Sequence, residues 1–284
     1  EEDKPISYCG IFGIYGSETA SAQAYYGLHA LQHRGQEASG IVTRSFNGDN
    51  RAHFNIIKGE GLVSEVFADH NLLTDVLFGD SAIGHNRYST TGSSKSRKNI
   101  QPFMVNYRMG NLAIGHNGNL TNAKELREEL VNEGAIFQTT SDTEVILHLI
   151  ARSKLDNQID QIMEALRRIE GAYCLVILTD DKLIAARDPL GFRPLSLGKL
   201  EDAFLVASET CAFDIQRAEF LREVEAGEMI VIDDESIKTK VIKSFRIKEV
   251  PEPQKHCVFE YIYFSRPDSF IFGHNVDKMR RRLG

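Results

Sequence analysis

The sequence has little of several features that define particular classes of protein. Its 284 residues include seven prolines, four cysteines and no tryptophan. No apolar run approaches the roughly 18 residues that a membrane span needs, and residues 1–5 are too acidic for a signal or transit peptide. With 33 basic and 40 acidic side chains, the net charge of −7 gives no electrostatic footprint for nucleic acid or an anionic membrane surface. We therefore expect a soluble, cytoplasmic protein that binds neither nucleic acid nor membrane.

The four cysteines are too few and too far apart for a disulfide framework or a zinc ribbon. They stand at positions 9, 174, 211 and 257, with no CxxC pair among them. Cys174 lies within an apolar run and is predicted to be a small core residue. Cys9 differs, because it opens an apolar run with two glycines directly after a leader, residues 1–8.

The composition is that of a globular chain, with 42% hydrophobic and 26% charged residues, and the length suggests one or two domains. Strands are predicted at residues 9–15, 40–44, 52–57, 81–87, 112–116, 204–207 and 229–233, with a hairpin of 172–179 and 182–187. Helices are predicted at residues 24–31, 122–134, 141–150 and 159–171, the second and third opening with capping boxes. Strand runs without regular βαβ alternation predict an α+β fold, with antiparallel sheets and helices packed outside them.

Cys9 could be a nucleophile if the leader is removed. It would then have both a thiol and a free α-amine, which is the nucleophile and base of an N-terminal nucleophile (Ntn) hydrolase. An α-amine titrates near ~8 and a thiol near ~8.5, so proton transfer between them is nearly balanced at neutral pH. The alternative is a cysteine that only starts a buried strand.

The Asn117-Gly118 pair follows a predicted strand and could form an oxyanion hole. A side-chain amide and a backbone N–H would then meet at one oxygen atom. The alternative is a hairpin turn, because Asn-Gly is a strong turn signal.

Two charged residues could bind the carboxylate and the ammonium group of a free amino acid. Arg87 ends a strand among small hydroxyl residues and could grip a carboxylate with two hydrogen bonds, or it could lie in a solvated loop. Asp142 could bind an ammonium group, or it could only stabilise the first turn of a helix. A thiol, an oxyanion hole, an arginine and an aspartate together favour glutamine as the substrate.

Five motifs together resemble the class II glutamine amidotransferase domain: residues 9–14, 31–40, 85–92, 116–119 and 141–144. Residues 188–194, 208–210 and 259–268 narrow the resemblance to the amidophosphoribosyltransferase family, and the likeness covers residues 9–284. The resemblance implies the four-layer αββα Ntn hydrolase fold with two antiparallel sheets. It also implies site roles: Cys9 as nucleophile, Arg87 for the glutamine carboxylate, Asp142 for its ammonium, Asn117 and Gly118 as oxyanion hole, and Gly35 lining the pocket through its backbone.

The resemblance also divides the chain. Residues 1–8 would be a propeptide, residues 9–250 the amidotransferase domain, and residues 251–284 a linker and the start of a phosphoribosyltransferase domain that this sequence lacks. The glutaminase half needs no cofactor. A 4Fe–4S cluster with Cys257 as one ligand, Mg²⁺, phosphoribosylpyrophosphate as second substrate, and a homodimer or homotetramer are expected of the full-length protein.

Two alternatives stay open at this point. One is a cysteine hydrolase that uses one of the nine histidines as its base and needs no free N-terminus. The other is a regulatory module that binds glutamine without cleaving it, which steady release of glutamate would exclude.

Overall fold

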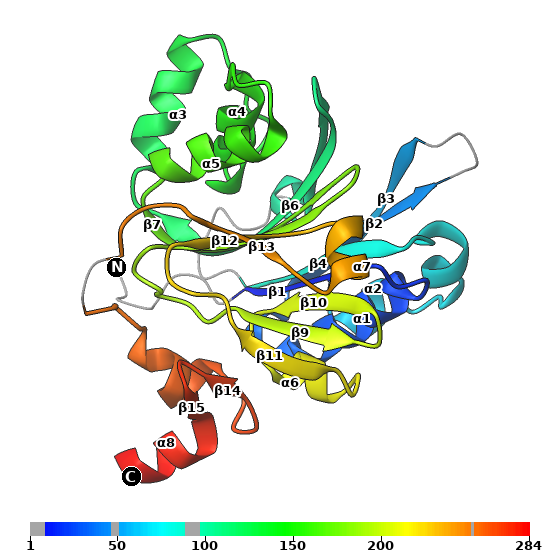
Figure 1. Ribbon diagram of the computed structural model, residues 1–284, viewed down its shortest axis with the longest axis vertical. Coiled ribbons are helices and arrows are strands. Elements are labelled where there is room, and N and C mark those ends of the chain that lie inside the picture. Colours follow the sequence, from blue (N-terminus) through cyan, green and yellow to red (C-terminus); the bar gives the residue numbers. More distant parts are fainter. Residues whose placement is uncertain (1–8, 47–50, 89–96, 251–252) are drawn as a thin grey trace.

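Two antiparallel sheets lie face to face with helices on both outer sides (Figure 1). The computed structural model describes residues 9–46, 51–88, 97–250 and 253–284. The predicted leader, residues 1–8, lies outside the described residues. The four-layer αββα arrangement confirms the predicted fold class.

The first sheet has seven strands and holds β1 at its centre. Its order is β11 (Glu219–Glu223), β9 (Ser196–Leu200), β10 (Ala203–Ala207), β1 (Gly10–Tyr15), β4 (Ser81–Arg87), β2 (Ala38–Phe46) and β3 (Ala52–Glu60). Every residue of β1 is buried, because Ile11 and Tyr15 face the second sheet while Phe12 and Ile14 face the helices. This two-sided burial explains the continuous apolar run in the sequence.

The second sheet has six strands. Its order is β13 (Lys243–Arg246), β12 (Glu228–Ile232), β8 (Leu183–Arg187), β7 (Gly171–Thr179), β6 (Gly110–Leu120) and β5 (Phe103–Tyr107). The predicted hairpin at residues 172–187 is present as β7 and β8. The predicted strand at 112–116 is longer than expected, because β6 continues through residues 117–120.

Helices cover the outer faces of both sheets (Figure 1). The first sheet packs against α1 (Ala20–Ala30), the 3₁₀ turn η1 (Gln32–Arg34), α2 (Val63–Val66), the π turn η2 (Leu72–Val76) and α6 (Cys211–Asp214). The second packs against α3 (Ala123–Asn132), α4 (Thr143–Arg152) and α5 (Gln158–Arg168). Two short elements, η3 (Arg97–Asn99) and α7 (Asp234–Thr239), precede β5 and β13. Separate apolar clusters fill the space between the sheets and the space under each helical layer.

The two predicted capping boxes are wrong, although the helices begin where expected. Asn122 is the N-cap of α3, but its side chain bonds to the backbone of Arg168 and Glu170 instead of capping the helix. Asp142 is the N-cap of α4 and also makes no capping hydrogen bond. Glu144 accepts hydrogen bonds from the Thr139 backbone and hydroxyl in the preceding loop. The Asn122 and Glu144 side chains, which would form the capping boxes, bond to other parts of the chain instead.

The C-terminal segment, residues 253–284, lies at one end of the molecule (Figure 1). It comprises the π turn η4 (Glu260–Phe264), the strands β14 (Phe270–Ile271) and β15 (His274–Asn275) and the helix α8 (Val276–Leu283). The segment has its own small apolar cluster. Cys257 N–H donates to the carbonyl of Phe192 at 3.1 Å, which attaches its beginning to the body of the protein.

Candidate active site

Cys9 immediately precedes the central strand β1 and is 7% exposed. Ser208 fixes the start of this strand, because its hydroxyl accepts from Ile11 N–H at 3.0 Å and its N–H donates to the Ile11 carbonyl at 3.1 Å. Burial raises the pKa of the Cys9 thiol, and this effect outweighs a hydrogen bond from the Tyr88 backbone and the attraction of Arg87. The thiol is therefore held in its neutral form.

Arg87 ends β4 beside Cys9. Gly10 is paired with Asn86 across the two strands, so continuing the register brings Arg87 opposite Cys9. Gly35 lies against the backbone of Arg87, where a Cβ atom at position 35 would come within 2.7–2.8 Å of the Arg87 N, C and O atoms. Only glycine allows this approach. Residues 89–92, the end of the predicted carboxylate-binding motif, lie outside the described residues.

Asn117 and Gly118 lie within strand β6, paired with Cys174 and Tyr173 of β7, so the alternative of a hairpin turn is wrong. The Asn117 side chain is fully buried, and neither its nitrogen nor its oxygen has a hydrogen-bond partner among the described residues. Such an unpaired buried amide is rare, because it costs about 1–3 kcal/mol. A donor group without a partner is therefore available for a ligand.

Gly118 shows why this strand approaches its neighbour closely. A Cβ atom at position 118 would lie 2.0 Å from the Ala172 carbonyl oxygen, so no other residue fits there without a shift of the strand. One residue earlier than Asn117, the His116 carbonyl accepts from Nε2 of His85 in β4 at 3.1 Å. This hydrogen bond between the sheets brings the ends of β4 and β6 together.

Asp142 connects helix α4 to the end of β6. Its carboxylate accepts from the Leu120 N–H at 2.9 Å, and its Oδ1 lies 3.6 Å from Nδ1 of His116. Burial alone raises the pKa of Asp142, but His116 and the backbone hydrogen bonds of Leu120 and Thr143 bring it below its ordinary value. The negative charge of Asp142 in turn raises the pKa of Cys9. The carboxylate is thus ionised close to the thiol.

A cavity of about 440 Å³ borders this site and reaches the C-terminal segment. It is lined by His33, Arg34, Gln36, Tyr88, residues 263–267 and Arg280. Tyr88 joins the cavity to the thiol, because its backbone N–H bonds to Cys9. A second cavity of about 470 Å³ lies between β5 and α4 and contains none of the predicted site residues.

Cys257 is buried beside Arg193. Its sulfur accepts from Nη1 of Arg193 at 3.8 Å. Within the described ranges, the side chains that could hold a metal ion are His33, Glu209 and Cys211, and Cys257 is not among them. The described residues therefore do not form an iron–sulfur site by themselves.

No described helix has the length and apolar character that crossing a membrane requires.

Sequence reasoning missed four residues that surround Cys9. The Ser208 hydroxyl accepts from the Ile11 N–H of β1, and the Tyr88 backbone bonds to the Cys9 thiol. Arg34 donates to the Cys9 carbonyl and to Glu260. Each belongs to a motif that carries the family resemblance. The sequence did not predict these contacts, because the residues that make them lie far apart in the sequence.

The comparisons with known proteins agree with this geometry. A family model described as "Glutamine amidotransferase domain" matches residues 85–214. Amidophosphoribosyltransferase 2 of Arabidopsis thaliana, a chloroplastic protein, is 49% identical over 100% of this chain and 48% of its own length. The chain spans about half the length of the curated relatives it matches.

Two solved structures share the fold at 48% identity. One is described as the allosteric regulatory enzyme of purine biosynthesis, with a TM-score of 0.88 over 97% of this chain and 56% of the other. The other is the glutamine phosphoribosylpyrophosphate amidotransferase of Bacillus subtilis complexed with ADP and GMP, with a TM-score of 0.87 over 97% and 57%. The fold and site thus define a glutamine amidotransferase of the Ntn type. Within that class, the chain belongs to the amidophosphoribosyltransferase family, of which it is the glutamine amidotransferase domain.

Proposed function

We propose that this chain hydrolyses glutamine to glutamate and ammonia with Cys9 as the nucleophile. The observation that carries the proposal is the buried, unpaired amide of Asn117 in β6, a strand that contacts β1, which Cys9 immediately precedes. Arg87 would bind the glutamine carboxylate, and Asp142 would bind its ammonium. The backbone of Gly35, which packs on Arg87, would line the same pocket.

The reaction follows from these positions. The Cys9 sulfur attacks the side-chain carbonyl carbon of glutamine, while the thiol proton passes to the Cys9 α-amine. The negative charge on the carbonyl oxygen is stabilised by Asn117 and the Gly118 N–H. The carbon–nitrogen bond then breaks, and the leaving nitrogen takes the proton and departs as ammonia. Water hydrolyses the γ-glutamyl thioester, which releases glutamate and restores the thiol.

This mechanism requires a free amine on Cys9, so we propose that residues 1–8 are a propeptide. A peptide bond between Tyr8 and Cys9 would replace the base with an amide nitrogen, which cannot accept the proton. Cleavage at that bond is the activating step.

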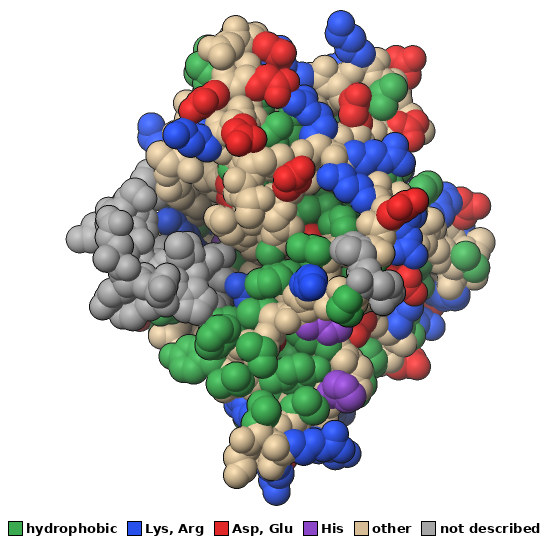
Figure 2. Space-filling model, turned by 90° about the vertical axis from the view of Figure 1, so that its left-hand side faces the viewer, with side chains coloured by type: hydrophobic (Ala, Val, Ile, Leu, Met, Phe, Trp, Pro, Cys, Tyr) green, Lys and Arg blue, Asp and Glu red, His purple; other side chains and the backbone are tan. Residues whose placement is uncertain are grey.

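In the whole protein, ammonia would react with phosphoribosylpyrophosphate to give phosphoribosylamine for purine synthesis. Relatives about twice as long, one of them named a phosphoribosylpyrophosphate amidotransferase, support a further domain after the C-terminal segment. The exposed apolar side chains of Val258, Phe259, Ile262 and Tyr263 support the same division near residue 250. Figure 2 shows hydrophobic side chains gathered in the lower half of the molecule, where this segment lies.

The proposal extends to the whole protein. We expect it to be cytoplasmic, although a plant relative is named chloroplastic, and to form a homodimer or homotetramer. Mg²⁺ and an iron–sulfur cluster take part in no step of glutamine hydrolysis by Cys9.

The test is glutamate release by the chain with Cys9 at its N-terminus. Cys9→Ala should abolish it. Asn117→Ala should lower kcat by roughly 10²–10³, the scale for one oxyanion donor, and change KM far less. Asn119→Ala is a matched control, because Asn119 is exposed on the same strand. Full glutaminase activity of Cys9→Ala would disprove the proposal, and glutamine binding without glutamate release would favour the sensing module.

A further inference from the structure

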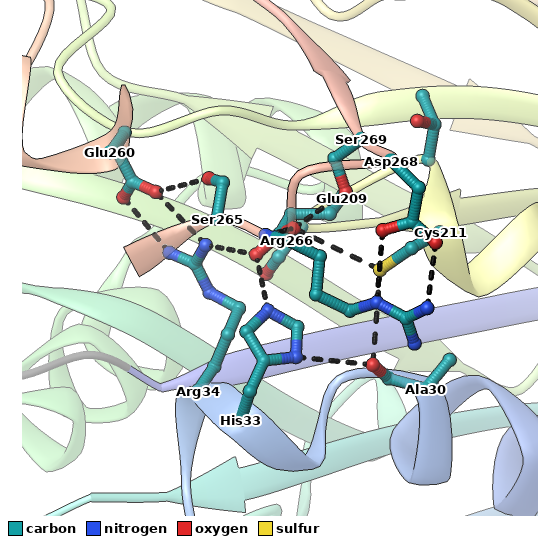
Figure 3. A network of polar contacts seen from close by, with 12 residues as sticks. Ala30, His33, Arg34, Glu209, Cys211, Glu260, Ser265, Arg266, Asp268 and Ser269 are labelled. Carbon is teal, nitrogen blue, oxygen red and sulfur yellow. Dashed lines mark hydrogen bonds and ion pairs between the residues drawn. The ribbon is translucent and has the colours of Figure 1, made fainter. Parts of the chain in front are cut away.

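Three of the motifs that carry the family resemblance contain residues without a role in the mechanism above. They are the His33-Arg34 pair after α1, Ser208-Glu209-Thr210 after β10, and residues 259–268 in the C-terminal segment. The structure brings their charged members together in one network (Figure 3), in which Arg34 also donates to the backbone carbonyl of Cys9.

Arg34 is the centre of this network. Its Nη1 donates to Glu209 Oε1 at 2.6 Å and to Glu260 Oε2 at 2.9 Å, and its Nη2 donates to Glu260 Oε1 at 2.9 Å. The contact with Glu260 is therefore bidentate, which fixes the plane of the guanidinium. The remaining nitrogen, Nε, donates to the backbone carbonyl of Cys9 at 3.2 Å.

The charges of this network depend on one another because all three side chains are fully buried. Burial alone raises the pKa of Glu209, but Arg34 and the hydrogen bond from His33 lower it to about 2. The pKa of Glu260 is also lowered, because Arg34 and Arg193 outweigh burial. Removal of one carboxylate partner would leave part of the buried Arg34 charge uncompensated, which is costly.

Glu260 is held by the C-terminal segment and by Arg193. Arg193 Nη1 donates to its Oε1 at 3.0 Å, and the Ser265 hydroxyl donates to its Oε2 at 2.9 Å. Glu209 is bound to the same segment, because it accepts from the Ser269 hydroxyl at 2.6 Å and from the Arg266 N–H at 2.9 Å. The segment is thus connected to Cys9 through one arginine.

Glu209 could also be viewed as part of a metal site, because ligand atoms of His33, Glu209 and Cys211 lie within 4.8 Å of one another. Both Glu209 oxygens are already occupied, however. Oε1 accepts from Arg34 and from His33 Nε2, and Oε2 accepts from Ser269 and Arg266. The Arg34 guanidinium supplies the positive charge that a metal ion would bring.

We propose that Glu260 and Arg34 are positioning residues for the Cys9 nucleophile, so that the C-terminal segment controls glutaminase turnover. Glu260 sets the orientation of Arg34, and Arg34 Nε holds the Cys9 carbonyl and with it the direction of the thiol. The inference rests on the proposed function of Cys9. It goes further by assigning a role in turnover to a segment outside the glutamine pocket.

The test measures kcat and KM for glutamine in the chain with Cys9 at its N-terminus, together with thermal unfolding midpoints. Glu260→Gln keeps the shape of the side chain and removes its charge, and Arg34→Lys removes the Nε donor. Both should lower kcat by about 10-fold or more, while KM changes by less than about 3-fold, since a small displacement of a reacting atom costs far more in rate than in binding. Glu260→Asp should recover part of the loss.

Asp80→Asn is the matched control. Asp80 pairs with the buried Arg44 at 2.7 Å, at the far end of β1 from Cys9. This substitution should lower the unfolding midpoint and leave kcat within about 2-fold of the parent, because the Asp80–Arg44 pair lies at the end of β1 opposite Cys9.

The outcomes separate the two proposals. If Cys9→Ala is inactive while Glu260→Gln and Arg34→Lys keep the kcat of the parent, the positioning role is wrong and the nucleophile stands. If Cys9→Ala retains activity, the proposed function itself fails. Should Glu260→Gln not fold, Ser265→Ala decides, because it removes only a hydroxyl that holds the Glu260 carboxylate. An unchanged kcat in that variant overturns the inference, and a lowered kcat at an unchanged KM supports it.

Discussion

The protonation of Cys9 is decided by its burial. Burial raises the pKa of the thiol, and Tyr88 and Arg87 only partly offset this. The thiol therefore needs a base at neutral pH. Among the described residues no hydrogen bond joins a histidine to Cys9. This arrangement favours the α-amine over the histidine-dependent alternative.

Arg87→Lys should weaken glutamine use, because a point charge replaces a planar fork that can bind both carboxylate oxygens. We expect kcat/KM to fall about 10–100-fold, which corresponds to about 1.4–2.7 kcal/mol. Steady-state kinetics of glutamate release measure this. Arg97→Lys is the control, because its side chain is 83% exposed in η3, the short element before β5. Equal kinetics for Arg87→Lys and the parent would show that Arg87 does not grip the carboxylate.

His85 makes the stability of the fold dependent on pH. Its Nε2 donates to the His116 carbonyl, and its Nδ1 has no partner in the described part of the chain. Burial lowers the pKa of His85 from 6.5 to about 3. Below pH 6.5 the unfolded chain binds a proton that the folded chain does not, so stability falls with pH until about pH 3. The expected loss from this residue between pH 7.5 and pH 5 is about 2 kcal/mol.

Urea unfolding at several pH values tests this effect. The free energy of unfolding of the parent should fall more steeply below pH 6.5 than that of His85→Gln. The exposed His29→Gln should keep the steep dependence of the parent. Parallel curves for the parent and His85→Gln would show that the imidazole is not held neutral by burial. The readout is the slope, so a lower overall stability of His85→Gln does not affect the conclusion.

At the level of helices and strands, local sequence patterns predicted most of the core elements. The apolar run at residues 9–15 and the three amphipathic helices beyond residue 120 are present. Asn117-Gly118 could have been a turn by local signals alone, yet it lies inside β6 because β7 supplies partners on that side. Both capping boxes failed for the same reason: Asn122 and Glu144 found distant or loop partners. Local motifs predict where a helix begins better than they predict which side chains form hydrogen bonds at its start.

Gly35 should control the placement of Arg87 at the end of β4. Gly35→Ala adds a Cβ atom within 2.7–2.8 Å of the Arg87 backbone, so the strand end or the loop after η1 must move. We expect a loss of stability of about 1–3 kcal/mol and a rise in KM for glutamine of roughly tenfold.

Gly59→Ala is the control for this prediction. Gly59 lies in β3, and a Cβ atom there would meet its nearest neighbour at 3.5 Å, which is ordinary contact. Glutamine kinetics and chemical denaturation measure both effects. An unchanged KM in Gly35→Ala would mean that the Arg87 backbone does not define the glutamine pocket.

At the scale of the whole molecule, the sequence suggested candidate site residues but not the contacts between distant motifs. Cys9, Arg87, Asn117 and Asp142 could be proposed from residue type and position along predicted strands and helices. The network around Arg34 could not, because its carboxylate partners Glu209 and Glu260 are 175 and 226 residues away. Ion pairs of this kind leave no periodic or local pattern. Only the fold shows that motifs after α1, after β10 and in the C-terminal segment meet at Arg34, which donates to the Cys9 carbonyl.

The last prediction concerns residues 1–8, which precede Cys9 in the sequence. The thiol is buried and protonated, so the mechanism depends on an amine that a Tyr8–Cys9 peptide bond would remove. A chain that retains Glu1 should fold and release no glutamate, whereas a chain with Cys9 exposed after methionine removal should be active. Intact mass identifies each form, and Cys9→Ala with an exposed N-terminus is the inactive reference. Full glutaminase activity in a chain shown by mass to retain Glu1 would contradict the amine-base mechanism and leave a histidine base as the better explanation.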